Sequence, residues 1–113
     1  MPFVTIDTNV KTTVTDAMLK EVTDMIVKTL NKPESAVTVK INTGMDITFG
    51  GSRKNLGALI EVKSIGYGDK KADLAKQLLD FAQMHFNAEG PLVGIHFVDM
   101  PANAVSHNGK LMG

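Results

Sequence analysis

The stretch NKPESAVTVKI, residues 31–41, decides how this chain is organised. It runs from the end of a helical pattern through a loop with Pro33 into an alternating segment that is typical of a half-buried strand. The same order returns in NAEGPLVGIHF, residues 87–97, where a loop with Pro91 leads into another strand pattern. The two stretches share a pattern rather than an identical sequence, which indicates that one structural unit occurs twice.

Each unit is predicted to consist of a strand, a helix and a second strand. In the first unit, residues 2–7 and 37–42 read as strands, and a helix runs from about Thr15 to Leu30 with apolar residues at helical spacing. In the second unit, strands at 56–65 and 92–98 flank a helix from about Lys70 to Asn87.

The segment 43–51 between the units contains three glycines and can hold a loop and a short extra strand with Met45, Ile47 and Phe49. Two strand–helix–strand units predict an α+β fold with a four-stranded mixed sheet and both helices on one face. We expect one domain over residues 1–113, with a pseudo-repeat at about 2–42 and 56–99. The tail 104–113 has few apolar residues and is expected to dock on a neighbouring subunit.

The strand at 56–65 carries apolar residues at both even and odd positions, which point to opposite faces of the sheet. Leu56, Ala58, Ile60 and Val62 share one face, whereas Leu59 and Ile65 are assigned to the other. Because two helices cover only one face of the sheet, an apolar second face would have to be buried by another chain. We therefore expect a closed homo-oligomer with rotational symmetry.

Composition excludes several classes of function. Twelve basic and twelve acidic side chains balance, so nothing recommends a nucleic acid or an anionic membrane as the partner. The chain has no cysteine, which excludes disulfides, thiolate metal sites and thiol catalysis. No secretory signal and no membrane-spanning apolar run is visible, so the expected location is the cytoplasm.

A proline directly follows the start methionine. Removal of Met1 would leave the Pro2 nitrogen as a free secondary amine. The pKa of a free α-amine lies at about 7.7–8.0, so burial or a nearby cation can leave it neutral and able to act as a general base. If Met1 stays attached, the Pro2 nitrogen is a tertiary amide without a basic lone pair. The alternative interpretation is that Pro2 only occupies a position where no backbone donor is needed.

Several short motifs occur in a fixed order along the chain. They are Met1-Pro2-Phe3, Thr8-Asn9-Val10, Asn31-Lys32-Pro33, Phe49-Gly50-Gly51-Ser52, Ser64-Ile65-Gly66, Asp99-Met100 with Ala102, and Asn108-Gly109. This ordered set resembles the macrophage migration inhibitory factor and D-dopachrome tautomerase family of the tautomerase superfamily, over essentially the whole chain. The resemblance implies a homotrimer of ferredoxin-like subunits and a keto–enol tautomerase of phenylpyruvate- or dopachrome-like small acids.

The same resemblance implies roles for individual residues. Pro2 matches the catalytic proline, and Lys32 matches the lysine that binds substrate oxygens and keeps the proline neutral. Ser64 and Ile65 match the pair beside the proline, with the Ile65 amide as a donor to substrate. Desolvation of the amine is assigned to Phe3, Ile65 and Val105. No metal or organic cofactor is implied, and His85, His96 and His107 lack metal-ligand spacing.

Some positions depart from the family pattern. Gly94 and His96 stand where a neighbouring subunit often contributes a tyrosine and an asparagine, and His107 stands in place of a tail tryptophan. His96 remains a candidate donor to substrate. A non-catalytic binding or signalling protein of the same fold is therefore an alternative, with its receptor unknown and secretion without a signal peptide left open. A muconate-type isomerase or a decarboxylase is a third reading.

Overall fold

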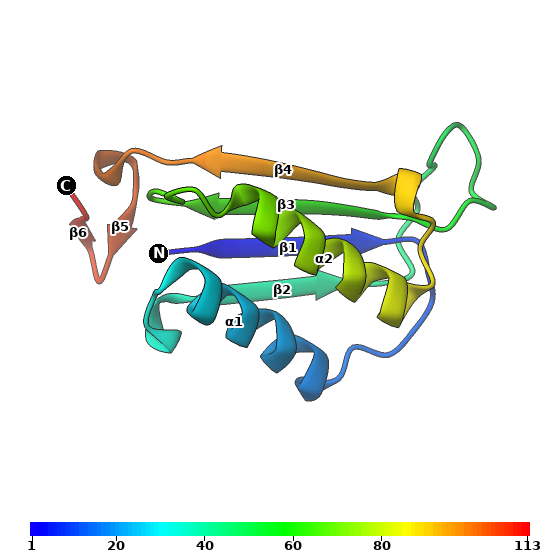
Figure 1. Cartoon of the computed structure of the whole chain (residues 1–113), viewed down its shortest axis with the longest axis horizontal. Helices are drawn as coiled ribbons and strands as arrows, with labels where there is room; N and C mark the ends of the chain where they lie inside the picture. Colours follow the sequence, from blue (N-terminus) through cyan, green and yellow to red (C-terminus); the bar gives the residue numbers. More distant parts are fainter.

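A computed structural model describes residues 1–113 and places two helices on one face of a four-stranded sheet (Figure 1). The sheet strands are β1 (Phe3–Thr8), β2 (Thr38–Asn42), β3 (Ala58–Ser64) and β4 (Val93–Asp99). The helices are α1 (Asp16–Leu30) and α2 (Lys71–Phe86), and the short helical turns are η1 (Glu34–Ala36), η2 (Gly90–Leu92) and η3 (Ala102–Ala104). A hairpin of β5 (Ser106–His107) and β6 (Lys110–Leu111) ends the chain.

The sheet has the order β2-β1-β3-β4, which confirms the predicted mixed sheet. β1 is parallel to β2, β3 is parallel to β4, and the two central strands β1 and β3 are antiparallel. Each helix connects two parallel neighbours, so each strand–helix–strand unit forms one half of the sheet. A parallel connection of this kind needs a long crossover, and a helix supplies it.

The core lies between the sheet and the two helices. Alternate residues of the central strands point into it and are fully buried, among them Val4 and Ile6 of β1 and Ile60 and Val62 of β3. The helices contribute a stripe of apolar side chains at helical spacing: Met18, Val22, Met25 and Ile26 from α1, and Leu74, Leu78, Phe81 and Phe86 from α2.

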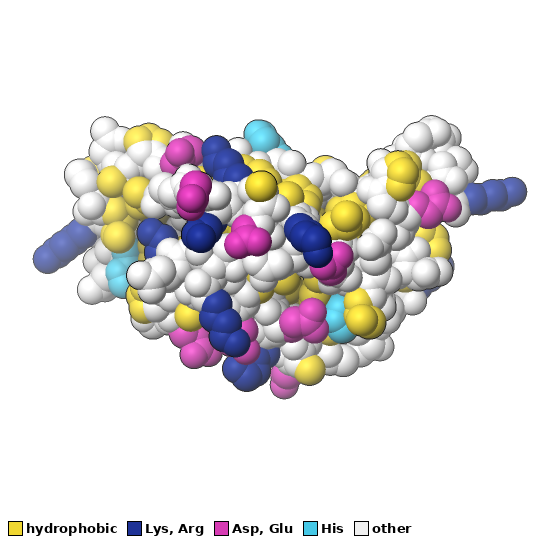
Figure 2. All heavy atoms as spheres, viewed as in Figure 1, with side chains coloured by type: hydrophobic (Ala, Val, Ile, Leu, Met, Phe, Trp, Pro, Cys, Tyr) yellow, Lys and Arg dark blue, Asp and Glu magenta, His cyan; other side chains and the backbone are white.

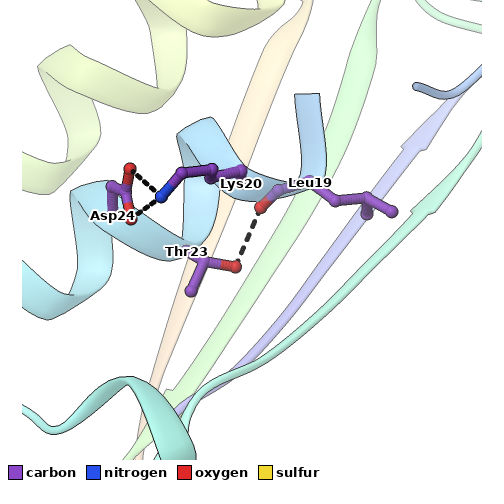
Figure 3. Close-up of polar contacts among 4 residues, drawn as sticks. All are labelled: Leu19, Lys20, Thr23 and Asp24. Atoms are coloured by element: carbon purple, nitrogen blue, oxygen red, sulfur yellow. Dashed lines mark hydrogen bonds and ion pairs between the residues drawn. The ribbon is translucent and has the colours of Figure 1, made fainter. Parts of the chain in front are cut away.

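Local signals fix the ends of α1. The side-chain oxygen of Thr15 accepts a hydrogen bond from the Met18 N–H at 3.2 Å, which caps the first turn. Asn31 adopts the left-handed conformation with φ 53° and ends the helix. On the exposed side, Lys20 pairs with Asp24, and the Thr23 hydroxyl donates to the Leu19 carbonyl (Figure 3).

The second face of the sheet is mixed and mostly polar, not apolar as predicted, because Phe3, Leu59 and Val98 share it with a larger number of polar residues. Leu59 does lie on that face and is 53% exposed, but its neighbours along the strand are Glu61 and Lys63. The register places Thr5, Lys40 and His96 in the same row as Glu61. Ile65 belongs to neither face, because β3 ends at Ser64. An apolar sheet face therefore gives no argument for an oligomer.

The extra strand expected at residues 43–51 does not form. The only pairing there is an isolated bridge between Phe49 and Ser52. The Phe49 carbonyl accepts from the Ser52 N–H at 3.3 Å in this bridge and also from the Asn55 side chain at 2.7 Å. The alternation of apolar residues is present, but only the start of the segment reaches the sheet. The Met45 N–H donates at 3.0 Å to the carbonyl of Thr8 at the end of β1, and no ladder continues from this contact.

The tail folds back on its own chain before it ends. The Met112 N–H donates to the Val105 carbonyl at 2.8 Å, so the β5–β6 hairpin closes against η3. Figure 1 shows this hairpin at the end of the molecule where the N-terminus also lies. Leu111 and Met112 remain exposed on it.

The surface seen in Figure 2 mixes basic and acidic side chains over the two helices, without a continuous patch of either sign. This distribution agrees with the balanced charge of the sequence. Neither helix combines the length and the apolar character that crossing a membrane requires.

Candidate active site

The topology brings several chain segments to one end of the sheet. β1 and β2 begin there, whereas β3 and β4 end there, because β1 is antiparallel to β3. The C-terminal end of α1 and the start of α2 reach the same end (Figure 1). Four predicted site residues, Pro2, Lys32, Ser64 and Ile65, occupy these positions and are therefore neighbours in space although they are far apart in sequence.

Pro2 is buried at the start of β1. Its ring is almost completely excluded from solvent, and its carbonyl accepts a hydrogen bond from the Thr38 N–H at 3.1 Å. In the unprocessed chain the terminal amine belongs to Met1. Burial, and then the charge of Lys32, lower the pKa of this amine below its ordinary value of 8.0. The start of the chain thus lies in an environment that favours a neutral amine.

Lys32 reaches this end from the residue after the α1 C-cap. The left-handed conformation of Asn31 turns the chain out of the helix, and the half-buried Lys32 side chain extends toward the end of β3. Its ammonium nitrogen donates to the Ile65 carbonyl oxygen at 3.4 Å. The alternative reading of Lys32, as a cation that only complements the helix dipole, does not account for this contact with a distant segment.

The segment Ser64–Tyr67 is held by several hydrogen bonds. The buried Ser64 hydroxyl donates to the Gly66 carbonyl at 3.1 Å, and the Ser64 carbonyl accepts from the Met100 N–H at 2.8 Å. The Gly66 N–H donates to Oδ1 of Asp99 at 3.1 Å. The Ser64 side chain therefore makes a structural contact within its own turn, and its predicted contact with substrate stays a prediction.

Tyr67 fastens the same segment to the sheet. Its hydroxyl lies 2.7 Å from the Val62 carbonyl oxygen and 2.8 Å from that of Val98, so it spans the ends of β3 and β4. Its ring also contacts Phe97 edge-on and lies under the Lys71 ammonium group. Burial, together with the negative charge of Asp99, raises the pKa of Tyr67 to about 12.

The Ile65 N–H makes no hydrogen bond within the chain. Its carbonyl, in contrast, is bound by Lys32. An amide that lies beside a cation and remains unpaired is available to an oxygen atom of a ligand.

A hollow of about 350 Å³ opens beside Lys32 and Ile65, between the end of α1 and residues 66–70. Pro2 does not line it. A larger hollow of about 490 Å³ between α1 and α2 contains none of the predicted site residues, and its lining includes Glu21, Asp24 and Asp80. The subunit alone therefore provides no single cavity that encloses Pro2, Lys32 and Ile65 together.

The remaining predicted residues, Phe3, His96 and Val105, do not line the hollow beside Lys32. Phe3 is half-buried on the open face of the sheet, opposite Lys63 and Thr38. His96 is exposed on the same face, in a hollow of about 360 Å³ with Glu61 and Lys63, and it is not brought to Lys32. Val105 is 4% exposed and lies between η3 and β5.

Two residues that hold the site together had no role assigned from the sequence, Asp99 and Tyr67. Asp99 ends β4 in register with Ser64 at the end of β3. The register was needed to reveal this pairing, although Asp99 stood in one of the ordered motifs, Asp99-Met100 with Ala102. No group of three or more His, Asp or Glu side chains is placed to hold a metal ion.

The family model described as Macrophage migration inhibitory factor matches residues 1–113. Macrophage migration inhibitory factor homologues from Brugia malayi and Trichuris trichiura are 34% and 35% identical to this chain. The first alignment covers 100% of both chains, and the second covers 97% of this chain and 98% of its relative.

Solved structures agree with these sequence matches. The macrophage migration inhibitory factor of Oncomelania hupensis superimposes with a TM-score of 0.92 at 29% identity, over 100% of this chain and 83% of the other. That of Trichinella spiralis gives a TM-score of 0.88 at 31% identity, over 96% and 98% of the two chains.

Proposed function

The chain belongs to the macrophage migration inhibitory factor family, and we propose that it is a keto–enol tautomerase that uses the Pro2 nitrogen as its general base. The observation that carries this proposal is the convergence of the buried Pro2, the Lys32 ammonium group and the unpaired Ile65 amide at one end of the sheet. The substrates are small acids of the phenylpyruvate or dopachrome type.

The reaction requires removal of Met1, which frees the Pro2 nitrogen as a secondary amine. A 1,3-proton shift then needs one group that takes a proton from carbon or oxygen and returns it at the other atom. The environment of the chain start supports a neutral amine, because burial and Lys32 both lower the pKa of the amine located there. Pro2 receives the proton and gives it back, so no external donor is consumed.

Lys32 and Ile65 act on the charge that develops on the substrate. Proton removal beside a carbonyl leaves an enolate oxygen, which a cation and an oriented N–H stabilise. The Lys32 ammonium group supplies the first interaction and the Ile65 N–H the second. Phe3, Val105 and Ile65 provide apolar surroundings that keep water from the amine.

Assembly as a homotrimer completes the pocket in this proposal. One subunit offers no single cavity around the three groups, so further walls have to come from another chain. The partner subunit's His96 is then a donor to substrate, which is consistent with its exposure on the open sheet face. The tail 104–113 docks on a neighbouring subunit, and the exposed Leu111 and Met112 are the apolar side chains that this contact would cover.

The experiment compares turnover of a phenylpyruvate enol by the processed wild type and by Pro2→Gly, with intact mass confirming that Met1 is absent. We expect the variant to lose at least about tenfold in kcat/KM, because general-base catalysis contributes about 10²–10⁴-fold. A second control inserts alanine between Met1 and Pro2, which keeps the ring but blocks the amine. Equal rates in all three proteins would contradict the proposal.

A binding or signalling role without useful turnover is the second candidate. Gly94 favours it, because the position where relatives often place an aromatic wall is open, with Leu59 Cδ1 3.9 Å away from where a Cβ atom would lie. Absence of Pro2-dependent turnover in the processed protein would support this candidate. Our proposal places the enzyme in the cytoplasm, whereas the binding role would also require export without a signal peptide.

A further inference from the structure

The peptide unit between Ile65 and Gly66 is bound at both of its ends. Its N–H, which belongs to Gly66, donates to Oδ1 of Asp99 at 3.1 Å. Its C=O, which belongs to Ile65, accepts from the Lys32 ammonium group at 3.4 Å. The chain contains no cis peptide bond, and the N–H and C=O of a planar trans peptide point in opposite directions. Asp99 and Lys32 therefore bind the planar Ile65–Gly66 peptide unit from opposite sides.

We propose that Asp99 is a positioning residue for Lys32 and acts on it through the Ile65–Gly66 peptide. The inference deepens the proposed function, on which its kinetic part rests. Asp99 does not touch the ammonium group in this arrangement. Its role is to fix the orientation of the carbonyl that Lys32 binds, and with it the place of the positive charge beside the chain start.

The orientation of this peptide needs such a restraint. Gly66 has φ +80°, a region that glycine enters freely and other residues rarely adopt. A glycine on one side of a peptide widens the range of orientations that the peptide can adopt, and hydrogen bonds at its polar ends narrow that range. The hydrogen bonds of Ser64 fix the neighbouring carbonyl of Gly66 and the strand end, but not the N–H of Gly66.

The charge of Asp99 strengthens the same connection. A carboxylate that accepts from an N–H forms a stronger hydrogen bond than a neutral acceptor does. Polarisation of the peptide by that bond makes its carbonyl a better acceptor on the other side. Lys32 thus meets an oxygen whose position and electron density both depend on Asp99, although 67 positions separate the two residues in the sequence.

The first test measures the Lys32 side chain directly by nuclear magnetic resonance in the full-length protein. We compare the wild type with Asp99→Ala, which removes the acceptor, and with Asp99→Asn, which keeps an acceptor oxygen without the charge. Asp99→Ala should shift the Gly66 amide proton upfield and move the Lys32 ε-methylene signals toward those of a solvated lysine, and Asp99→Asn should restore part of both shifts. Asp73→Ala is the matched control, because it removes an exposed carboxylate from the first turn of α2.

The second test is a double-mutant cycle on tautomerase kinetics. Asp99→Ala should raise KM for the enol substrate by about fivefold, the scale of one lost hydrogen bond. In a Lys32→Ala background the same substitution should have no further effect. Unchanged Lys32 signals in a folded Asp99→Ala protein, or full additivity in the cycle, would overturn the inference. Wild-type protein without Pro2-dependent turnover would instead contradict the proposed function, and the resonance measurement would still decide the role of Asp99.

Discussion

The ammonium nitrogen of Lys32 lies 3.4 Å from the carbonyl oxygen of Ile65, 33 positions further along the chain. The contact joins the end of α1 to the segment that follows β3, and it places a cation next to the start of β1. The charge of Lys32 therefore acts on the end of α1, on the segment after β3 and on the start of β1 together. The stability and the titration of this end of the molecule should respond when any one of them is changed.

Replacing Lys32 should change the titration of the terminal amine. In protein that retains Met1, Lys32→Gln should raise the pKa of that amine toward its ordinary value, because the second cause of its lowering is removed. Between the lowered pKa and 8.0 the unfolded chain binds more protons than the folded one, so stability rises with pH in that window. In Lys32→Gln the free energy of unfolding should rise less steeply with pH over this window. Resonance titration of the Met1 methyl group measures the pKa, and Lys28→Gln in the exposed last turn of α1 should leave it unchanged.

Removing the Tyr67 hydroxyl should destabilise the protein. Tyr67→Phe leaves the carbonyl groups of Val62 and Val98 without this donor, at a cost of about 1–3 kcal/mol in the free energy of unfolding. Urea denaturation checks the value, and an unchanged dependence on urea would show that the unfolded state is the same. A loss below about 0.5 kcal/mol would mean that water replaces the hydroxyl.

Alkaline titration should find Tyr67 resistant to ionisation. It is the chain's single tyrosine, so ultraviolet difference spectroscopy reports it alone, and its midpoint should lie near 12. The raised pKa means that the folded state holds this proton more tightly than the unfolded state, whose value is 10.0. Stability from this group is complete below pH 10.0 and is lost as the pH rises toward 12. A midpoint at the ordinary value would contradict the buried hydroxyl.

Two glycines should respond in opposite ways to alanine. A Cβ atom on Gly57 would lie 2.5 Å from the Leu92 carbonyl oxygen and 2.7 Å from the Phe49 ring, so backbone has to move. Gly57→Ala should therefore cost about 1–3 kcal/mol in the free energy of unfolding. Gly94→Ala is the control, since its nearest atom would be 3.9 Å away, and it should be neutral or slightly stabilising. Thermal unfolding of both variants distinguishes these outcomes.

Gly94→Tyr should add an aromatic wall to the neighbouring pocket if the subunits form the proposed trimer. A Cβ atom at Gly94 meets no atom of its own subunit closer than Leu59 Cδ1 at 3.9 Å, so the first atom of the new side chain causes no clash. We expect KM for phenylpyruvate to fall by about threefold to tenfold, the scale of one aromatic contact. KM for an aliphatic keto acid such as pyruvate should change less. An equal change for both substrates would indicate that residue 94 does not face the ring of the substrate.

Much of the fold could be predicted from the sequence because each signal was local. The apolar periodicity locates α1 and α2 to within a residue. The asparagine that follows each helix adopts positive φ. The start of β3 was placed two residues early. The Gly57 N–H binds the Asn9 side chain instead of joining the ladder, a contact between segments 48 positions apart that no local pattern could show.

The two failed structural predictions share one cause. The apolar alternation of Met45, Ile47 and Phe49 fits a strand, but a strand exists only with a partner. Leu59 and Ile65 were assigned to a common face because the end of β3 was unknown. In each case the apolar residues were identified correctly, but the sequence did not show which segment of the chain lies next to them.

By itself, the sequence determined the two strand–helix–strand units, the absence of thiol chemistry and, through its ordered motifs, the family and the candidate residues Pro2, Lys32 and Ile65. Only the tertiary structure decided that the open sheet face is mostly polar, that the Ser64 hydroxyl donates within its own turn, and that Asp99 and Lys32 bind opposite sides of one peptide. The physical reason for this division is that apolar periodicity and helix caps depend only on residues within the same helix or strand. The register of β3 against β4 and the orientation of a peptide beside Gly66 depend on contacts between segments that are distant in the sequence.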